Sequence, residues 1–155
     1  MKRCVLAIAA ALPLLASCGG GGDSYPPAGP NEPQPANVEG AWLKFDPAQV
    51  SFAEKWASRT EFSITGNSQR ALPDTFYVFI EYEAGLLESS FTTTRVAPPE
   101  GAVDAFRLDL STASPFKGNH KGSLKISLCQ AFSALTCRAP IEGSPWNVPY
   151  DITVE

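Results

Sequence analysis

Apolar side chains recur at every second position along much of this chain. Four stretches show the alternation, and their apolar members are Phe62 and Ile64; Phe106, Leu108 and Leu110; Leu124, Ile126 and Leu128; and Tyr150, Ile152 and Val154. A period of two puts successive side chains on opposite faces of a strand, whereas an amphipathic helix needs a period of 3.6. The alternation therefore predicts half-buried β-strands.

A further segment is apolar without alternation. Phe76–Ile80 runs directly into Glu81-Tyr82-Glu83, which predicts a central strand buried on both faces. Weaker strand patterns cover residues 42–45, 50–52 and 89–96, while residues 53–59 lack a strand pattern and are a candidate for a helical turn. Turn signals separate these segments: Gly66-Asn67, Pro73-Asp74, Gly85, Pro98-Pro99, Gly118-Asn119 and Gly143-Ser144-Pro145.

Short strands joined by such turns predict an all-β fold. About seven strands in roughly 110 residues are typical of an immunoglobulin-like (Ig-like) antiparallel β-sandwich. A small closed barrel is the alternative that the same pattern permits.

The first residues have the pattern of an export signal. Lys2 and Arg3 precede the apolar stretch 5–16, which is shorter than the roughly 20 residues that a membrane-spanning helix needs. The pattern predicts a signal peptide over residues 1–17, removed before folding. One interpretation of such a signal is ordinary secretion, in which the cysteine at position 18 is coincidental.

The end of this segment carries a more specific motif. Leu15-Ala16-Ser17-Cys18 is similar to the lipobox of bacterial lipoproteins. The resemblance implies that Cys18 is acylated on sulfur, cut from Ser17 and acylated again on its new amino group. Several acyl chains anchor a protein stably, whereas one chain binds a membrane only marginally. Gly19 stands where an aspartate retains enterobacterial lipoproteins in the inner membrane, so the resemblance favours the outer membrane.

Low-complexity sequence follows the cysteine. Five of the 14 prolines and five of the 12 glycines lie between Gly19 and Pro35. A segment of this composition buries no apolar surface, so residues 18–37 are predicted to form a disordered tether and residues 38–155 the folded domain.

The charge of the chain excludes one class of partner. The sequence has 12 Lys and Arg against 16 Asp and Glu, and loss of Lys2 and Arg3 with the signal peptide takes the net charge from −4 to −6. Nucleic-acid binding needs clustered basic residues to contact phosphates. We therefore expect no nucleic-acid partner and no electrostatic attraction to anionic lipid.

Two cysteines remain for the folded domain once Cys4 is removed and Cys18 is lipidated. Cys129 and Cys137 lie on either side of a turn, and an oxidising envelope compartment favours a disulfide between them. So short a loop would contribute roughly 2–3 kcal/mol. A zinc site and a pair of free buried thiols are the alternatives, although His120 is the single histidine that could join a zinc site.

The C-terminal region resembles a known family. The strand 122–129 ending in a cysteine, the second cysteine at 137 and the segment 143–154 are similar to the closing strands of Ig-like modules in proteobacterial extracytoplasmic proteins. The opening segment Trp42–Pro47 also fits such modules. The resemblance implies an Ig-like sandwich whose last two strands are joined by Cys129 and Cys137. It implies no catalytic residues, because these modules act as spacers and binding units.

Residues for catalysis are scarce. His120 lies in a Gly-rich turn, where a solvated side chain is the simpler interpretation than a general base. The sequence has no Gly-x-Ser-x-Gly elbow, His-Glu-x-x-His motif or phosphate-binding loop. We therefore expect no enzyme, no metal and no cofactor.

The sequence does contain candidate ligand-binding residues. Trp56 lies in the least regular segment and is the tryptophan expected to be exposed, while Glu81 and Glu83 are two apart and would share a strand face. Solvation of a strand end is the simpler explanation of this carboxylate pair. Two functions remain: a membrane-anchored, non-catalytic Ig-like module that binds or spaces an envelope protein through an exposed sheet edge, or a glycan-binding lipoprotein that uses Trp56 with Glu81 or Glu83.

Overall fold

The described part of the chain is all-β. The computed structural model describes residues 34–35, 37, 39–113, 115–133 and 136–155, so the predicted signal peptide, Cys18 and most of the predicted tether lie outside it. Among these residues, no helix is long and apolar enough to span a membrane. The strands are β1 (Gln34–Pro35), β2 (Leu43–Asp46), β3 (Val50–Glu54), β4 (Glu61–Ser68), β5 (Tyr77–Glu81), β6 (Thr92–Val96), β7 (Asp104–Ser111), β8 (Gly118–Ser133), β9 (Thr136–Pro140) and β10 (Trp146–Val154).

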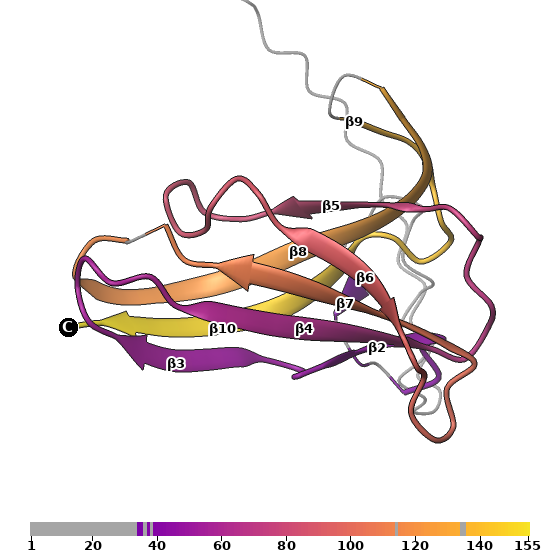
Figure 1. The fold of residues 1–155 in the computed structure, drawn as a ribbon, viewed down its shortest axis with the longest axis horizontal. Coiled ribbons are helices and arrows are strands. Elements are labelled where there is room, and N and C mark those ends of the chain that lie inside the picture. Colours follow the sequence, from indigo (N-terminus) through magenta and orange to yellow (C-terminus); the bar gives the residue numbers. More distant parts are fainter. Residues whose placement is uncertain (1–33, 36, 38, 114, 134–135) are drawn as a thin grey trace, which may run out of the picture.

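These strands form two sheets that face each other in a β-sandwich-like arrangement (Figure 1). Sheet A has the order β1-β10-β8-β5, with β3 also pairing β10 and β9 also pairing β8. Sheet B has the order β2-β4-β7-β6. The all-β prediction is confirmed, but the described residues contain ten strands where about seven were expected.

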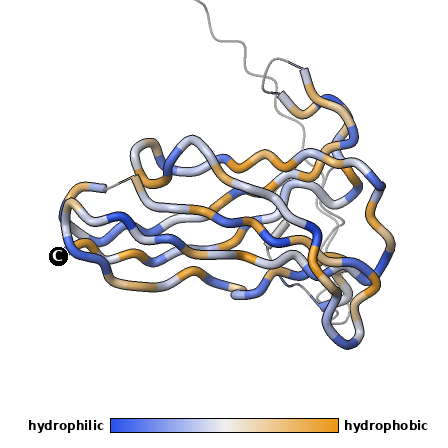
Figure 2. Tube along the Cα trace, viewed as in Figure 1, coloured by the Kyte–Doolittle hydropathy of each residue, from blue (hydrophilic) through white to orange (hydrophobic). Residues whose placement is uncertain are grey.

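The core follows the alternation in the sequence. Apart from the half-buried Phe62, the apolar members of the four alternating stretches are all buried between the sheets. Figure 2 shows the same pattern as hydrophobic and hydrophilic segments that alternate along the strands. The largest fully buried side chains are Trp146 from sheet A and Phe106 from sheet B.

Two glycines let aromatic rings approach the strands closely. Gly66 on β4 lies between Phe45 on β2 and Phe106 on β7, and the two rings meet edge to face with centroids 6.3 Å apart. A Cβ atom on Gly66 would lie well inside contact distance of the Phe106 ring. In sheet A, Gly122 lies opposite Tyr150, where a Cβ atom would be 2.8 Å from the ring carbon Cζ. Each ring therefore fills the space that a side chain would otherwise need.

The prediction of a central strand at Phe76–Ile80 is wrong. β5 pairs only with β8 among the described strands and lies at an edge of sheet A. Its five residues are exposed or half-buried, and none is fully buried. The continuous apolar run has a different cause, because Val78 and Ile80 pair with the core residues of β8 while Tyr77 and Phe79 face away from the core.

The antiparallel prediction holds for most pairs but not for the N-terminal strands. β1 and β3 both run parallel to β10, with Val50–Glu54 aligned to Tyr150–Val154. The candidate helical turn at residues 53–59 is also wrong, because β3 continues to Glu54 and the Trp56 N–H then donates to the carbonyl of Glu155 at 2.7 Å. Ala57 completes a turn with φ 62°.

A short strand, β1, precedes the predicted domain boundary at residue 38. Gln34 and Pro35 pair with the first two residues of β10. The Asn37 side chain accepts from the Phe45 N–H at 2.6 Å and donates to the Phe45 carbonyl at 2.8 Å. Three residues that were assigned to the tether, Gln34, Pro35 and Asn37, therefore contact the strands of the folded domain.

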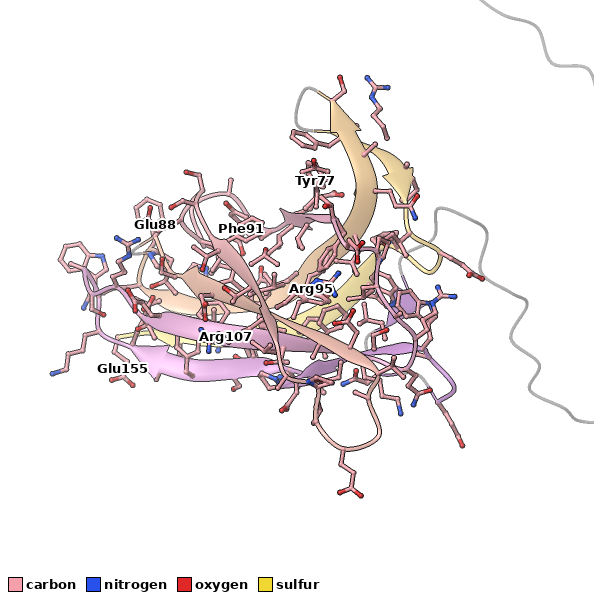
Figure 3. All side chains as sticks on the ribbon, turned by 45° about the vertical axis from the view of Figure 1, so that its right-hand side comes forward. Tyr77, Glu88, Phe91, Arg95, Arg107 and Glu155 are labelled. Carbon is pink, nitrogen blue, oxygen red and sulfur yellow. A yellow bond between two sulfur atoms is a disulfide. The ribbon has the colours of Figure 1, made fainter. Side chains whose placement is uncertain are left out.

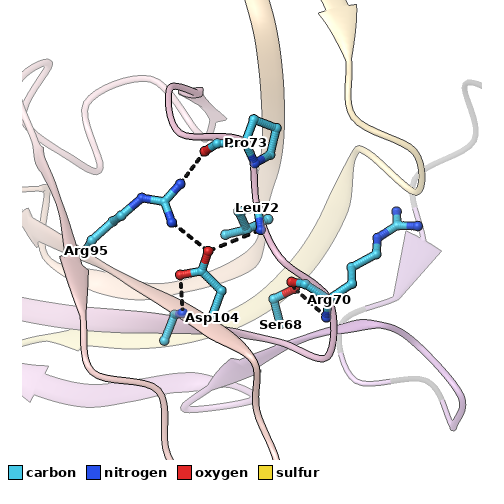
Figure 4. A network of polar contacts seen from close by, with 7 residues as sticks. Ser68, Arg70, Leu72, Pro73, Arg95 and Asp104 are labelled. Carbon is cyan, nitrogen blue, oxygen red and sulfur yellow. Dashed lines mark hydrogen bonds and ion pairs between the residues drawn. The ribbon is translucent and has the colours of Figure 1, made fainter.

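One half-buried carboxylate, that of Asp104, stabilises the loop that leads into β5 (Figure 4). Asp104 accepts from the Leu72 N–H at 3.1 Å and the Ala105 N–H at 2.9 Å, and it pairs with Arg95 at 2.5 Å. Arg95 also donates to the Pro73 carbonyl. Burial alone raises the pKa of Asp104, but the hydrogen bonds from Leu72, Arg95 and Ala105 and the charge of Arg95 together hold that pKa below 3.8.

Replacing Asp104 by asparagine is expected to lower the free energy of unfolding at pH 7 by about 1–2 kcal/mol, because hydrogen bonds to a charged group are lost. The pKa of the folded carboxyl is depressed, so its stabilisation is complete above the ordinary value of 3.8 and disappears as the pH falls through the lower folded value. Urea unfolding from pH 7 to pH 2 should show the two proteins converging in acid. The exposed Asp74 in the neighbouring loop supplies the control Asp74→Asn, and equal losses in both variants would contradict the prediction.

Candidate functional site

A disulfide-closed hairpin projects from the sandwich. We call residues 129–133 of β8 and 136–140 of β9 the arm, which belongs to sheet A and projects away from the other strands in Figure 1. Cys129 and Cys137 are bonded, with Cα atoms 5.7 Å apart, so the predicted disulfide is confirmed and the zinc and free-thiol alternatives are wrong. The bond lies within the β8–β9 hairpin and does not join the last two strands, which are β9 and β10.

The bend of the arm results from irregular pairing. The register of β8 with β9 shifts on either side of Ala131, as at a β-bulge, and bulges bend and twist the strand that carries them. Phe132 follows the bulge and packs against the start of β5. The disulfide closes the same segment, so the position of Phe132 is fixed by both constraints.

Three aromatic side chains gather where the arm meets β5. Phe132 lies 4.4 Å from the Tyr77 ring and 6.0 Å from the Phe79 ring, measured between centroids. Tyr77 remains 38% exposed and Phe132 47% exposed. Figure 3 shows Tyr77 at the foot of the arm. We call Tyr77, Phe79 and Phe132 the edge patch, because Tyr77 and Phe79 belong to β5, the strand at the edge of sheet A among the described strands.

A hollow of about 270 Å³ lies beside the edge patch. It is lined by Glu81, Lys125, Ser127, Cys137, Pro140, Ser144 and Pro145. Glu81 and Lys125 lie opposite each other on β5 and β8 and pair at 3.0 Å. The pair is partly exposed and contributes little stability, but it leaves this end of β5 without net charge.

A second exposed aromatic surface lies at the other end of the sandwich. Trp56 is 56% exposed, as expected, and the Lys117 Nζ atom lies 5.8 Å from its ring centroid. Phe116, the neighbour of Lys117, is 87% exposed. We call Trp56, Phe116 and Lys117 the tip.

Glu83 and His120 connect the tip end to sheet A. The Tyr150 hydroxyl donates to Glu83 at 3.1 Å, and burial together with that carboxylate raises the pKa of Tyr150. The His120 Nδ1 atom lies 3.9 Å from Glu83, and its Nε2 atom lies 2.7 Å from the Phe116 carbonyl. These contacts fasten the start of β8 to the loop after β5. Glu83 and His120 also line a hollow of about 280 Å³.

Another hollow, of about 370 Å³, is lined by residues of β4, β6 and β7 in sheet B and of the segment just before β6. Its floor includes Asp109, which accepts from Ser63 at 2.7 Å and pairs with Arg107 at 2.9 Å. The Ser63 hydroxyl and then the Arg107 charge hold the pKa of Asp109 below its usual value. The carboxylate is thus engaged by its own neighbours, and we assign no ligand to this hollow.

One carboxylate is buried near the tip. Glu54 accepts from the Thr112 hydroxyl at 2.8 Å, while its other oxygen has no partner among the described residues. Thr112 in turn accepts from the Thr60 N–H at 2.9 Å. Glu54 lines none of the three hollows described above, so these contacts join the end of β3 to the end of β7 and form no open site.

The predicted site residues do not meet in one place. Glu81 ends β5 and contacts Lys125, whereas Glu83 lies beyond the strand and contacts Tyr150. The expectation that the two carboxylates share a strand face fails because β5 ends at Glu81. Trp56 has its own contact at the tip. The lipidation of Cys18 stays a prediction, since that residue lies outside the described part of the chain.

Sequence reasoning missed the edge patch. The length of the apolar run was the sequence feature that could have indicated this patch. An edge strand with one buried face needs an apolar residue only at every second position, so Tyr77 and Phe79 are two apolar residues more than the core requires. The described residues hold no group of three or more His, Cys, Asp or Glu side chains arranged to bind a metal. Comparison of the chain with protein-family models and with curated proteins gives no match.

Proposed function

We propose that this protein is a lipid-anchored, non-catalytic Ig-like module of the bacterial cell envelope, and that it binds a protein partner at the open edge of β5. The lipobox-like motif ending at Cys18 supports the anchor, and Gly19 supports the outer membrane. The observation that carries the binding proposal is the placement of the apolar strand β5 at a sheet edge that pairs with no other strand in the described part of the chain.

Strand order supports the Ig-like assignment. Ig constant-type domains have strands A, B, E and D in one sheet and C, F and G in the other. The order β2-β4-β7-β6 corresponds to A-B-E-D, and the order β10-β8-β5 corresponds to G-F-C. In this correspondence the arm belongs to the F–G connection, at one of the two ends where sandwich domains carry their loops.

The composition of the edges supports strand addition at β5. Natural edge strands are protected by charges, proline or bulges, because unpaired backbone groups attract other strands. β2 carries Lys44 and Asp46, β6 carries Arg95, and β9 carries Arg138 and Pro140. β5 has no charge from Tyr77 to Ile80, and its first residue lies beside the exposed Phe132. An edge of this kind suits an incoming strand, which gains main-chain hydrogen bonds and apolar contacts together.

The ring geometry favours a protein partner over a glycan. A sugar-binding platform presents a flat aromatic face, whereas Phe132 is tilted by 60° to Tyr77 and by 58° to Phe79. The glycan alternative depends on Trp56 at the tip, whose ring lies near Lys117, whereas Glu81 pairs with Lys125 and Glu83 accepts from Tyr150. Glycan-array binding that Trp56→Ala abolishes would favour that alternative.

Site-specific photocrosslinking tests the proposal. A photoreactive phenylalanine replaces Phe79 in the full-length protein, and a matched protein carries it at Thr93 on the open edge of β6. We expect protein adducts in the envelope fraction from position 79 and few from position 93. Cys18→Ser should move the protein out of the membrane fraction. The absence of adducts at position 79, or equal adducts at both positions, would overturn the binding proposal.

A further inference from the structure

We propose that the strand completing the β5 edge is β5 of a second copy of this chain, paired antiparallel across a two-fold axis at Phe79. The inference rests on the proposed function, because it names the partner at the same edge. It unites two facts: the sequence of β5 has the character of a central strand, and the single copy leaves that strand at an edge. In the dimer, β5 is bounded by β8 on one side and by its own copy on the other.

The two-fold axis fixes the register of the pair. Phe79 lies opposite Phe79 of the second copy, and Tyr77 lies opposite Glu81 of the second copy. On the other face, Val78 lies opposite Ile80 of the second copy. Directly opposed residues in antiparallel strands have Cα atoms about 4.5–5.5 Å apart, so every one of these pairs is in contact.

In this register the side chains of β5 are complementary to those of β5 in the second copy. The phenol of Tyr77 is a hydrogen-bond donor and the carboxylate of Glu81 is an acceptor, and the symmetry forms that contact twice. Val78 and Ile80, which are half-buried in one copy, become covered by apolar side chains. Phe79 stacks against its equivalent. The pairing therefore leaves no charge unmatched along the strand.

Electrostatics also permit this approach. The chain carries a net charge of −4, which disfavours close contact of two copies over most surfaces. At the β5 edge, Glu81 is already neutralised by Lys125 at 3.0 Å, and Tyr77 to Ile80 are uncharged. The two acidic proteins thus meet along a neutral stretch. Five residues a side make a small interface, so we expect a weak dimer that is favoured by crowding on a membrane.

Cysteine cross-linking in cells tests both the partner and the register. Full-length proteins carrying Tyr77→Cys, Phe79→Cys or Glu81→Cys are treated with a mild oxidant, and dimers are counted on non-reducing gels. We expect Phe79→Cys to cross-link to itself. Tyr77→Cys and Glu81→Cys should each stay monomeric, because equivalent residues are then about 13 Å apart, beyond the reach of a disulfide. Co-expression of the Tyr77→Cys and Glu81→Cys proteins should restore the cross-link.

Two controls guard against misinterpretation. Thr93→Cys tests the other open edge and should give no dimer, and peptide mass mapping should find the Cys129–Cys137 bond intact in every variant. Phe79→Lys, which opposes two positive charges at the axis, should lower photocrosslinking of the second copy from a neighbouring position such as Tyr77 to background.

The outcomes separate this inference from the proposed function. Adducts at position 79 that contain only a different protein, with no Phe79→Cys dimer, overturn the second-copy inference and leave protein binding standing. Self-cross-linking of Tyr77→Cys alone overturns the register, and with it the inference. No adduct and no dimer at any position overturn both proposals.

Discussion

Trp146→Ala is expected to lower the free energy of unfolding by about 4 kcal/mol, which is a large part of the 5–15 kcal/mol that such domains possess. Trp146 is 1% exposed and stands at the first position of β10. Its ring meets Trp42 edge to face at 5.5 Å and Phe45 at 6.2 Å, so it joins residues from both sheets. Alanine removes the ring and leaves a cavity that rigid strands on both sides cannot fill.

The matched control for this variant is the same substitution at the tip. Trp56→Ala removes an equally large side chain from a site that is 56% exposed, and we expect a change within about 0.5 kcal/mol. Urea unfolding followed by circular dichroism compares the two midpoints. A similar loss in both variants would show that Trp146 has no special role in joining the sheets.

Gly66→Ala is expected to destabilise the protein by about 1–3 kcal/mol although it adds a single methyl group. The new Cβ atom would lie inside the Phe106 ring contact, with the ring carbon Cε2 at 3.1 Å and two other ring atoms closer. Phe106 is fully buried and is itself held edge to face by Phe45 and Phe76. The ring therefore cannot move aside without disturbing two others.

A double-mutant cycle tests this mechanism. Phe106→Leu removes the ring atoms that the methyl group would meet, so Gly66→Ala should cost much less in the Phe106→Leu background than in the natural protein. Denaturant unfolding of the four proteins gives the coupling energy. Additive losses would contradict steric conflict and would indicate that Gly66 matters for another reason, such as the conformation of β4.

Much of the fold could be predicted because burial of one strand face produces a local pattern of alternating apolar and polar residues. Leu124, Ile126 and Leu128 alternate with polar residues, and each of these apolar side chains is buried. The position of a strand within its sheet, central or at the edge, produces no such local pattern. The segment Phe76–Ile80 was predicted to be central because five apolar residues in a row usually mean two buried faces. The second face of β5 is instead an edge surface, which Phe132 covers only in part.

The candidate site could be predicted only for features that depend on a single residue or on a single pair of cysteines. The exposure of Trp56 and the bond between Cys129 and Cys137 follow from local sequence and from the small number of cysteines. The edge patch depends on a contact between Phe132 and Tyr77, which lies 55 positions earlier in the sequence. The contact requires the bulge in β8, and no turn residue in the sequence predicts that bulge. Contacts of this kind are decided by tertiary register, and a single sequence does not encode them in any local pattern.

The parallel pairing of β3 with β10 constrains when this protein can fold. The partner of the early strand Val50–Glu54 is the segment Tyr150–Val154, which follows it in the sequence by about 100 residues. Synthesis produces β3 first, and β3 then lacks this neighbour until Tyr150–Val154 has been made. A chain handed to an export channel during synthesis would therefore arrive there unable to close its sandwich. The pairing of β3 would be completed only after β10 has crossed.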